Sequence, residues 1–179
     1  MDIILLILLI ILFVILATFA IGGILAAPYL PTLPKQRKHI ISLIDLKKGN
    51  IVYDFGCGDG SLLFACVKKN PGIKTIGFEI ALLPYLIGVF RKFLGRHKNV
   101  NIKYRNLFSQ KIEDADIIFV FLQEKCYPRL INKFKKELKD NCLVVVEAWP
   151  LKNTQPYKTI QKEGFVPVYF YKGRQFTNP

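Results

Sequence analysis

Acidic residues are scarce in this chain of 179 residues, which has 13 Asp and Glu against 26 Lys and Arg. The resulting net charge of +13 favours anionic partners, either anionic lipid or nucleic acid. Of the two we expect lipid, because each well-placed Lys or Arg beside an anionic bilayer gains roughly 1 kcal/mol. Intrinsic disorder is excluded, since 51% of the residues are hydrophobic.

Cysteine and histidine are also few, with four and two residues. Cys57, Cys66, Cys126 and Cys142 form no C-x-x-C pair, and neither histidine lies near them in the sequence. This spacing does not match the common zinc sites, so we expect no metal. Cysteines without a disulfide or zinc pattern indicate a reducing compartment.

Charge is absent from residues 3–27, where Thr18 is the one polar side chain. About 20 apolar residues span the hydrocarbon core of a bilayer, so this stretch predicts a transmembrane anchor. A cleaved signal peptide is the alternative, but the apolar run is too long and no basic residue precedes it. Because the basic residues follow the stretch, we expect the rest of the chain on the cytoplasmic side.

The prolines of residues 28–38 predict a stiff, extended connector. From residue 39 to 179, apolar runs alternate with helical patterns, which predicts one α/β domain with a mostly parallel sheet and helices on both faces. Pro167 places the last strand at an edge or next to a bulge. The expected strands are 51–55, 74–79, 101–105, 116–122, 142–148 and 165–171. The expected helices are 39–46, 61–69, 86–94, 128–139 and 157–162.

The most informative motif is the glycine loop, residues 54–60 (DFGCGDG), between an expected strand and an expected helix. Glycines let the backbone turn sharply and approach a ligand. The spacing G-x-G-x-G differs from a dinucleotide fingerprint, and Asp54 and Asp59 would repel a pyrophosphate but suit a cationic sulfonium. Glu79 ends the next expected strand, where an acid can accept hydrogen bonds from ribose hydroxyls. A nicotinamide cofactor and a turn without any ligand are the alternatives.

The glycine loop and Glu79 resemble motif I and the following acid of class I S-adenosylmethionine (SAM) methyltransferases. The resemblance implies a Rossmann-like sheet that binds SAM, with Asn106 where the family often has Asp near the adenine. It implies cofactor contacts from Asp54, Gly56, Cys57, Gly58, Asp59, Gly60, Glu79, Ile80, Asn106 and Leu107. The family usually has seven strands, so the six expected strands indicate an incomplete C-terminal hairpin.

The order of apolar stretch, Ala-Pro-Tyr-Leu-Pro-Thr (residues 27–32) and glycine loop is similar to a group of membrane-tethered lysine methyltransferases. That group acts on the ATP synthase c-subunit and the adenine nucleotide translocase. The resemblance implies that Pro31 and Thr32 help to close over the cofactor, and that the methyl acceptor is a lysine of a membrane or membrane-adjacent protein. Residues 80–84 and 123–125 depart from the group near the expected substrate side. A lipid, quinone or other hydrophobic small molecule is therefore an alternative acceptor, and a non-catalytic SAM-binding scaffold is another alternative.

Candidate catalytic residues are expected at the carboxyl ends of the fourth and fifth strands, where open α/β sheets bind ligands. There Glu124 or Glu147 can orient an incoming amine, although neither is a strong base at its ordinary pKa. Trp149 could form a wall of the amine channel, but we expect it to pack in the core. Residues 82–94 are apolar nearly all round and could contact lipid, but we expect them to pack in the core as well. The Asn/Asp-Pro-Pro-Tyr/Phe and Pro-Cys motifs of base-modifying enzymes are missing, so we do not expect a nucleic-acid substrate.

Overall fold

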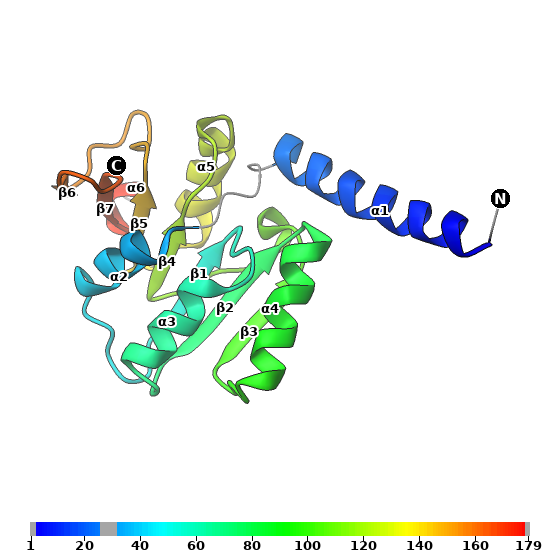
Figure 1. Cartoon of the computed structure of the whole chain (residues 1–179). Helices are drawn as coiled ribbons and strands as arrows, with labels where there is room; N and C mark the ends of the chain where they lie inside the picture. Colours follow the sequence, from blue (N-terminus) through cyan, green and yellow to red (C-terminus); the bar gives the residue numbers. More distant parts are fainter. Residues whose placement is uncertain (1–2, 26–31, 178–179) are drawn as a thin grey trace.

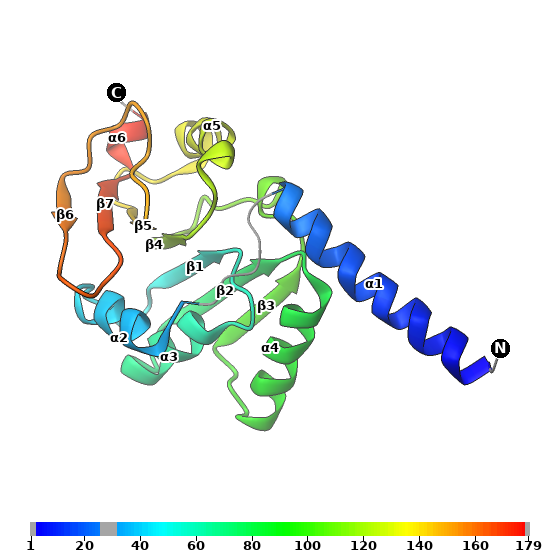
Figure 2. The same ribbon diagram turned by 45° about the horizontal axis from the view of Figure 1, so that its top comes forward.

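A computed structural model of the chain describes residues 3–25 and 32–177, and its centre is one seven-stranded sheet (Figures 1 and 2). The strand order is β3-β2-β1-β4-β5-β7-β6. The first five strands of the chain are parallel, and β7 is antiparallel to both β5 and β6. The strands are β1 (Ile51–Phe55), β2 (Lys74–Glu79), β3 (Val100–Tyr104), β4 (Ile117–Val120), β5 (Leu143–Glu147), β6 (Lys158–Ile160) and β7 (Val168–Lys172).

Helices cover both faces of the sheet, as the sequence predicted. The helices are α1 (Ile3–Leu25), α2 (Pro34–Ser42), α3 (Ser61–Lys69), α4 (Leu82–Leu94), α5 (Tyr127–Glu137) and α6 (Arg174–Thr177), with short 3-10 turns η1 (Leu107–Ser109) and η2 (Glu124–Cys126). In Figure 1, α2, α3 and α4 lie on one face, and α5 and α6 lie on the other. Each face has its own hydrophobic core, which explains why the central strands β1, β4 and β5 are apolar except for Asp54 and Glu147 near their carboxyl ends.

The C-terminal hairpin differs from the prediction in two ways. Residues 157–162 were expected to form a helix, but Lys158–Ile160 is the edge strand β6, paired with β7. The β-branched residues Thr159 and Ile160 favour a strand, and a short edge strand has little apolar periodicity by which to recognise it. With β6 present the sheet is complete, so the expected truncation is wrong. Pro167 precedes β7, which lies inside the sheet rather than at its edge.

The domain begins earlier than expected, because α2 starts at Pro34. Proline suits the first helical turn, where its missing N–H has no partner to lose. Gln36 and Ile40 are buried, and α2 contacts α3. The extended connector predicted for residues 28–38 is therefore wrong from Pro34 onward, and residues 28–31 lie outside the described part of the chain. The helix expected at 39–46 ends already at Ser42, and α4 begins four residues earlier than expected; the remaining predicted elements lie within three residues of their expected bounds.

The apolar N-terminal stretch forms the helix α1, whose side chains from Ile3 to Val14 are exposed. Within residues 3–25 and 32–177, no helix meets the combined requirement of length and hydropathy for crossing a membrane. The structure therefore does not support the transmembrane anchor predicted for residues 3–27, of which 26 and 27 are not described.

Candidate functional site

The glycine loop follows β1 beside the point where the strand order reverses, between β1 and β4. Open α/β sheets bind their ligands at such a point. Gly56, Gly58 and Gly60 have positive φ angles of 75°, 56° and 72°, which residues other than glycine rarely adopt. A Cβ at Gly60 would also lie 2.6 Å from Ile102 Cδ1. The loop therefore needs its glycines, both for its conformation and for its close packing.

Glu79 connects the glycine loop to the end of β2. Its Oε2 accepts a hydrogen bond from Gly58 N at 2.8 Å. Its Oε1 accepts from Ile80 N at 2.8 Å and from Ala81 N at 2.7 Å. These three bonds fix the carboxylate at the edge of the sheet where the resemblance implied a contact with ribose, and Ile80 takes part through its backbone.

Three buried carboxyl groups share this edge of the sheet. Asp54, Glu79 and Glu147, which we call the carboxylate cluster, have exposed fractions of 7%, 8% and 5%. Among the described residues none of them belongs to an ion pair. Burial, helped by the charges of Glu79 and Glu147, raises the pKa of Asp54 to about 8. A cationic ligand would favour the ionised forms, so the cluster fits the sulfonium and ammonium groups of SAM.

Two of the predicted loop contacts, Asp59 and Cys57, have side chains that pair or pack within the protein, and their contact with the cofactor stays a prediction. Asp59 forms an ion pair with Arg91 of α4, whose Nη1 also donates to Ser61 Oγ at 2.8 Å. Its charge is therefore compensated, and it adds little to the attraction of a cation. Cys57 is buried with its Sγ against Gly77, and burial raises the pKa of this thiol. The backbone N–H of Cys57 bonds to Phe78 O at 3.1 Å and fixes the loop.

The pair Asn106-Leu107 follows β3, as expected, and shapes the turn there. Asn106 Oδ1 accepts from Phe108 N at 3.0 Å and so caps η1. Leu107 is buried in the hydrophobic core beneath the turn. The Asn106 amide in this structure serves the backbone, as an Asp side chain would, and the expected adenine contact stays a prediction.

The two candidate catalytic acids have different surroundings. Glu124 lies at the surface and pairs with Lys152, with 3.0 Å between Oε2 and Nζ. Glu147 is buried, and burial raises its pKa to about 7 against the opposing hydrogen bonds from Gln36 and Thr32. The Thr32 bond is long, with 3.5 Å between Oγ1 and Oε2. Of the two, only Glu147 lies with the carboxylate cluster.

An aromatic pair stands at the ends of β4 and β5; the sequence analysis named its Trp149 but missed Phe121. The rings of Phe121 and Trp149 are stacked, with centroids 6.3 Å apart and an angle of 18°. Trp149 is 42% exposed, so the expectation that it packs in the core is wrong. Its backbone is held by Tyr127 Oη, which donates to Trp149 O at 3.0 Å. A lone Phe after an apolar strand gives no sequence signal that separates it from a core residue.

Gln36 is a second residue that the sequence analysis missed. Its Nε2 donates to Val166 O at 3.0 Å, and its Oε1 accepts from Val166 N at 3.1 Å. Together with the hydrogen bond to Glu147, these contacts hold the segment after residue 31 against the carboxyl edge of β5. Glutamine in a short polar helix gives no sequence signal of such a role.

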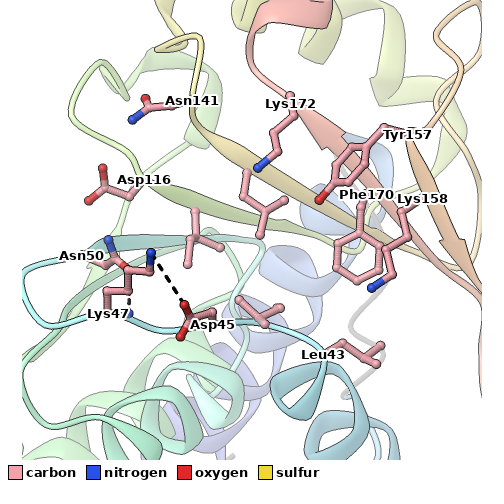
Figure 3. A pocket seen from close by; sticks show the side chains of 13 residues that line it. Leu43, Asp45, Lys47, Asn50, Asp116, Asn141, Tyr157, Lys158, Phe170 and Lys172 are labelled. Carbon is pink, nitrogen blue, oxygen red and sulfur yellow. Dashed lines mark hydrogen bonds and ion pairs between the residues drawn. The ribbon is translucent and has the colours of Figure 1, made fainter.

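A cavity of about 360 Å³ lies at the opposite edge of the sheet, near the starts of β4 and β5 (Figure 3). Asp116 in the cavity wall accepts a hydrogen bond from Ile51 N at 2.8 Å and forms an ion pair with Lys139 at 2.7 Å, so its negative charge is compensated within the protein. The cavity contains no residue of the glycine loop or the carboxylate cluster. It is therefore separate from the predicted cofactor site.

Known solved structures share this fold. An RNA methyltransferase from Salinibacter ruber, in complex with S-adenosyl-L-homocysteine, has a TM-score of 0.74 and 22% identity, covering 80% of this chain and 93% of that one. The mitomycin 7-O-methyltransferase MmcR has a TM-score of 0.63 and 12% identity, covering 77% and 53%. At these identities the likeness concerns the fold.

Sequence comparisons identify the family. A protein-lysine N-methyltransferase of Saccharolobus islandicus (strain REY15A) is 28% identical over 139 residues, which cover 76% of this chain and 85% of that protein. The sequence profile of the ANTKMT methyltransferase domain matches residues 54–158, more than half of the chain, and these residues contain the glycine loop and Glu79. The chain therefore belongs to the ANTKMT methyltransferase domain family and is a class I, SAM-dependent methyltransferase.

Proposed function

We propose that the chain methylates the side-chain amine of a lysine in a membrane or membrane-adjacent protein. The observation that carries the proposal is the similarity to the protein-lysine N-methyltransferase of Saccharolobus islandicus, which extends over 76% of the chain. The site supports it, because a buried carboxyl group and a stacked aromatic pair stand together at the carboxyl ends of β4 and β5.

The chemistry requires the chain to align and deprotonate the amine. Bound SAM supplies an activated methyl group, which passes to the amine nitrogen as the carbon–sulfur bond breaks. A lysine with a pKa near 10.4 needs about 4.6 kcal/mol to lose its proton at pH 7. With a pKa of about 7, Glu147 is a better proton acceptor than an ordinary glutamate. The lysine ammonium group takes the place of the Thr32 hydroxyl as hydrogen-bond donor to Glu147, and it then transfers a proton to the Glu147 carboxylate.

The aromatic pair gives the lysine side chain its path to Glu147. The faces of Phe121 and Trp149 attract a cation and pack against the methylene groups of a lysine. Trp149 follows Glu147 by two residues, and Ala148 between them has a positive φ of 75°. This conformation sets the direction of the chain at the point where the ring leaves the strand. Binding and deprotonation of the amine thus occur at neighbouring positions.

Glu147→Gln is expected to lower the methylation rate about 100-fold, because the amide cannot take a proton. Binding of SAM should change far less, since Asp54 and Glu79 are kept. Glu124→Gln is the matched control, and it should retain nearly full activity because Glu124 pairs with Lys152 at the surface. Rates are measured with membranes of the source cells as substrate. A fully active Glu147→Gln enzyme would contradict the role of Glu147.

The acceptor itself is identified with radiolabelled SAM. The full chain is incubated with the same membranes, and protein and lipid are then extracted separately. Label in methylated lysine after acid hydrolysis of the protein supports the proposal. Label in the lipid extract would replace it with methylation of a lipid, a quinone or another hydrophobic small molecule. Bound SAM without transfer to either fraction would favour a non-catalytic scaffold.

SAM binding is expected to weaken as the pH falls through about 8, the pKa of Asp54. The reason is that a cationic ligand needs the ionised carboxylate, so binding below this pH releases a proton, which costs up to about tenfold in affinity per pH unit. The pKa of the folded state lies above that of the unfolded chain. Without SAM, the free energy of unfolding should therefore decrease as the pH rises from the ordinary pKa of 3.8 to about 8, and should level off above that. Calorimetry in buffers of different ionisation enthalpy measures the proton release, and Asp54→Asn should abolish it.

We also propose that α1 attaches the domain to a membrane, with the domain on the cytoplasmic side. The exposed apolar side chains from Ile3 to Val14 support attachment, because water-exposed apolar surface of this extent is unusual. All four cysteines are buried and form no disulfide among the described residues, which is compatible with a reducing compartment. Flotation of the full chain with lipid vesicles tests the attachment, and protease protection in cells tests the side.

A further inference from the structure

Helix α4 packs against the sheet with its small residues. Pro84 and Gly88 are the buried members of the helix. A Cβ at Gly88 would lie 2.6 Å from Ile102 Cδ1 and 3.0 Å from Asp59 O, so the helix backbone approaches β3 and the glycine loop closely. The expectation that α4 places its large apolar side chains in the core is therefore wrong.

The large apolar side chains of α4 face outward instead. They recur at intervals of three and four residues and form one stripe along the helix. Phe90 is 61% exposed and Phe93 is 75% exposed. An amphipathic helix of a water-soluble domain has the opposite orientation, so the stripe needs a partner. We call this surface the α4 stripe; it consists of Leu83, Leu86, Ile87, Phe90, Phe93 and Leu94.

The charge around the α4 stripe has one sign. From Leu82 to Asn99, which covers α4 and the turn after it, the sequence has no acidic residue and four basic ones. Arg91 forms an ion pair with Asp59, whereas Arg96 and Lys98 are exposed just after the C-terminal end of α4. The four basic residues are Arg91, Lys92, Arg96 and Lys98. An apolar stripe with a basic border is complementary to the surface of an anionic bilayer.

The stripe is also continuous with a second apolar surface. Helix α1 contacts α4 and extends away from the sheet (Figures 1 and 2). The described side chains of α1, those of residues 3–17 and 20, are all apolar, and the contact between α1 and α4 places them beside the stripe's helix. A bilayer can cover the apolar surfaces of α1 and α4 at the same time, whereas a partner protein with a groove for a single helix cannot.

We propose that the α4 stripe lies in the boundary between the headgroups and acyl chains of an anionic bilayer. Helix α4 begins three residues after Glu79, so this position brings the cofactor edge of the sheet close to the lipid surface. The inference rests on the proposed attachment through α1, but it does not depend on the identity of the methyl acceptor. It adds a specific contact that orients the domain on the membrane.

The test uses the full chain with one environment-sensitive fluorophore. Phe93→Cys places the label on the stripe, and Glu163→Cys places it on the exposed loop between β6 and β7. The native cysteines are buried and do not compete for the label. With phosphatidylcholine and phosphatidylserine vesicles, the label at 93 should shift to shorter wavelength and be quenched several-fold by spin-labelled lipid. The label at 163 should not change.

A chain with the charge reversals Arg96→Glu and Lys98→Glu should lose its preference for phosphatidylserine vesicles. Its partition coefficient onto them should fall about fivefold for each positive charge removed. Flotation of the same samples separates the two proposals. Chains that float without quenching at 93 overturn the contact of α4 while the attachment through α1 stands. A blue shift at 93 that needs no vesicles and grows with protein concentration overturns it in favour of a second copy of the chain.

Discussion

Glu79→Ala is expected to weaken SAM binding at least about 100-fold. The carboxylate is the common acceptor for the backbone N–H groups of Gly58, Ile80 and Ala81, so its loss releases the glycine loop from β2. It would also remove the acceptor that the resemblance implies for the ribose hydroxyls, and hydrogen bonds to a charged group contribute about 1.5–3 kcal/mol each. Calorimetric titration of SAM into the full chain in detergent measures the loss.

Asp59→Asn is the matched control for this result. Both residues are acids near the glycine loop, but Asp59 forms its ion pair with Arg91 on α4. Partly exposed pairs contribute about 1 kcal/mol or less, so SAM affinity should fall by about fivefold at most. Circular dichroism confirms that both variants are folded. A large effect at Asp59 with none at Glu79 would reverse the assignment of the two acids.

Gly77→Ala is expected to lower the free energy of unfolding by about 3 kcal/mol, at the upper end of overpacking effects. The new methyl group would lie 2.4 Å from Cys57 Sγ, and 2.7 Å from both Cys57 Cβ and Leu63 Cδ1. The glycine loop and α3 would have to move away from β2. For a chain of this size the melting temperature should fall by roughly 6–12 °C, as thermal unfolding followed by circular dichroism would show.

A second substitution tests the cause. Cys57→Ala in the Gly77→Ala chain removes the nearest atom, so part of the lost stability should return. Gly49→Ala is the comparison at an open site, where nothing lies within 4 Å and the cost comes from the positive φ of 89° alone. If the Gly77→Ala protein melts at the temperature of the unaltered protein, β2 and the loop are less closely packed than the structure indicates.

The cofactor half of the site was predictable because its signal is local. The glycine loop and Glu79 lie within 26 consecutive residues, and their roles follow from a strand, a turn and the end of the next strand. The sequence also named Glu147 as a candidate, but the contacts around it were not predictable, for the opposite reason. Thr32 reaches Glu147 across 115 residues of sequence, and Gln36 reaches Val166 across 130. No periodicity or spacing encodes such contacts.

The orientation of α4 shows a second limit of sequence reasoning. Periodicity identifies residues that share one side of a helix, such as Phe90 and Leu94, but it does not say which side meets the sheet. Here the close approach at Gly88 decides, because only a small residue lets the helix lie against β3. The prediction of core packing followed the usual behaviour of large apolar side chains, and the structure has them outside.

The two hydrogen bonds between Gln36 and the backbone of Val166 have a consequence for synthesis on the ribosome. Strands β1 to β4 pair with one another, and they can assemble while the rest of the chain is still being made. The segment of Thr32 and Gln36 is made first, yet its partner emerges almost last. Gln36 therefore waits for its partner, and a nascent chain can form the glycine loop and its bond to Glu79 before the bonds that hold Gln36.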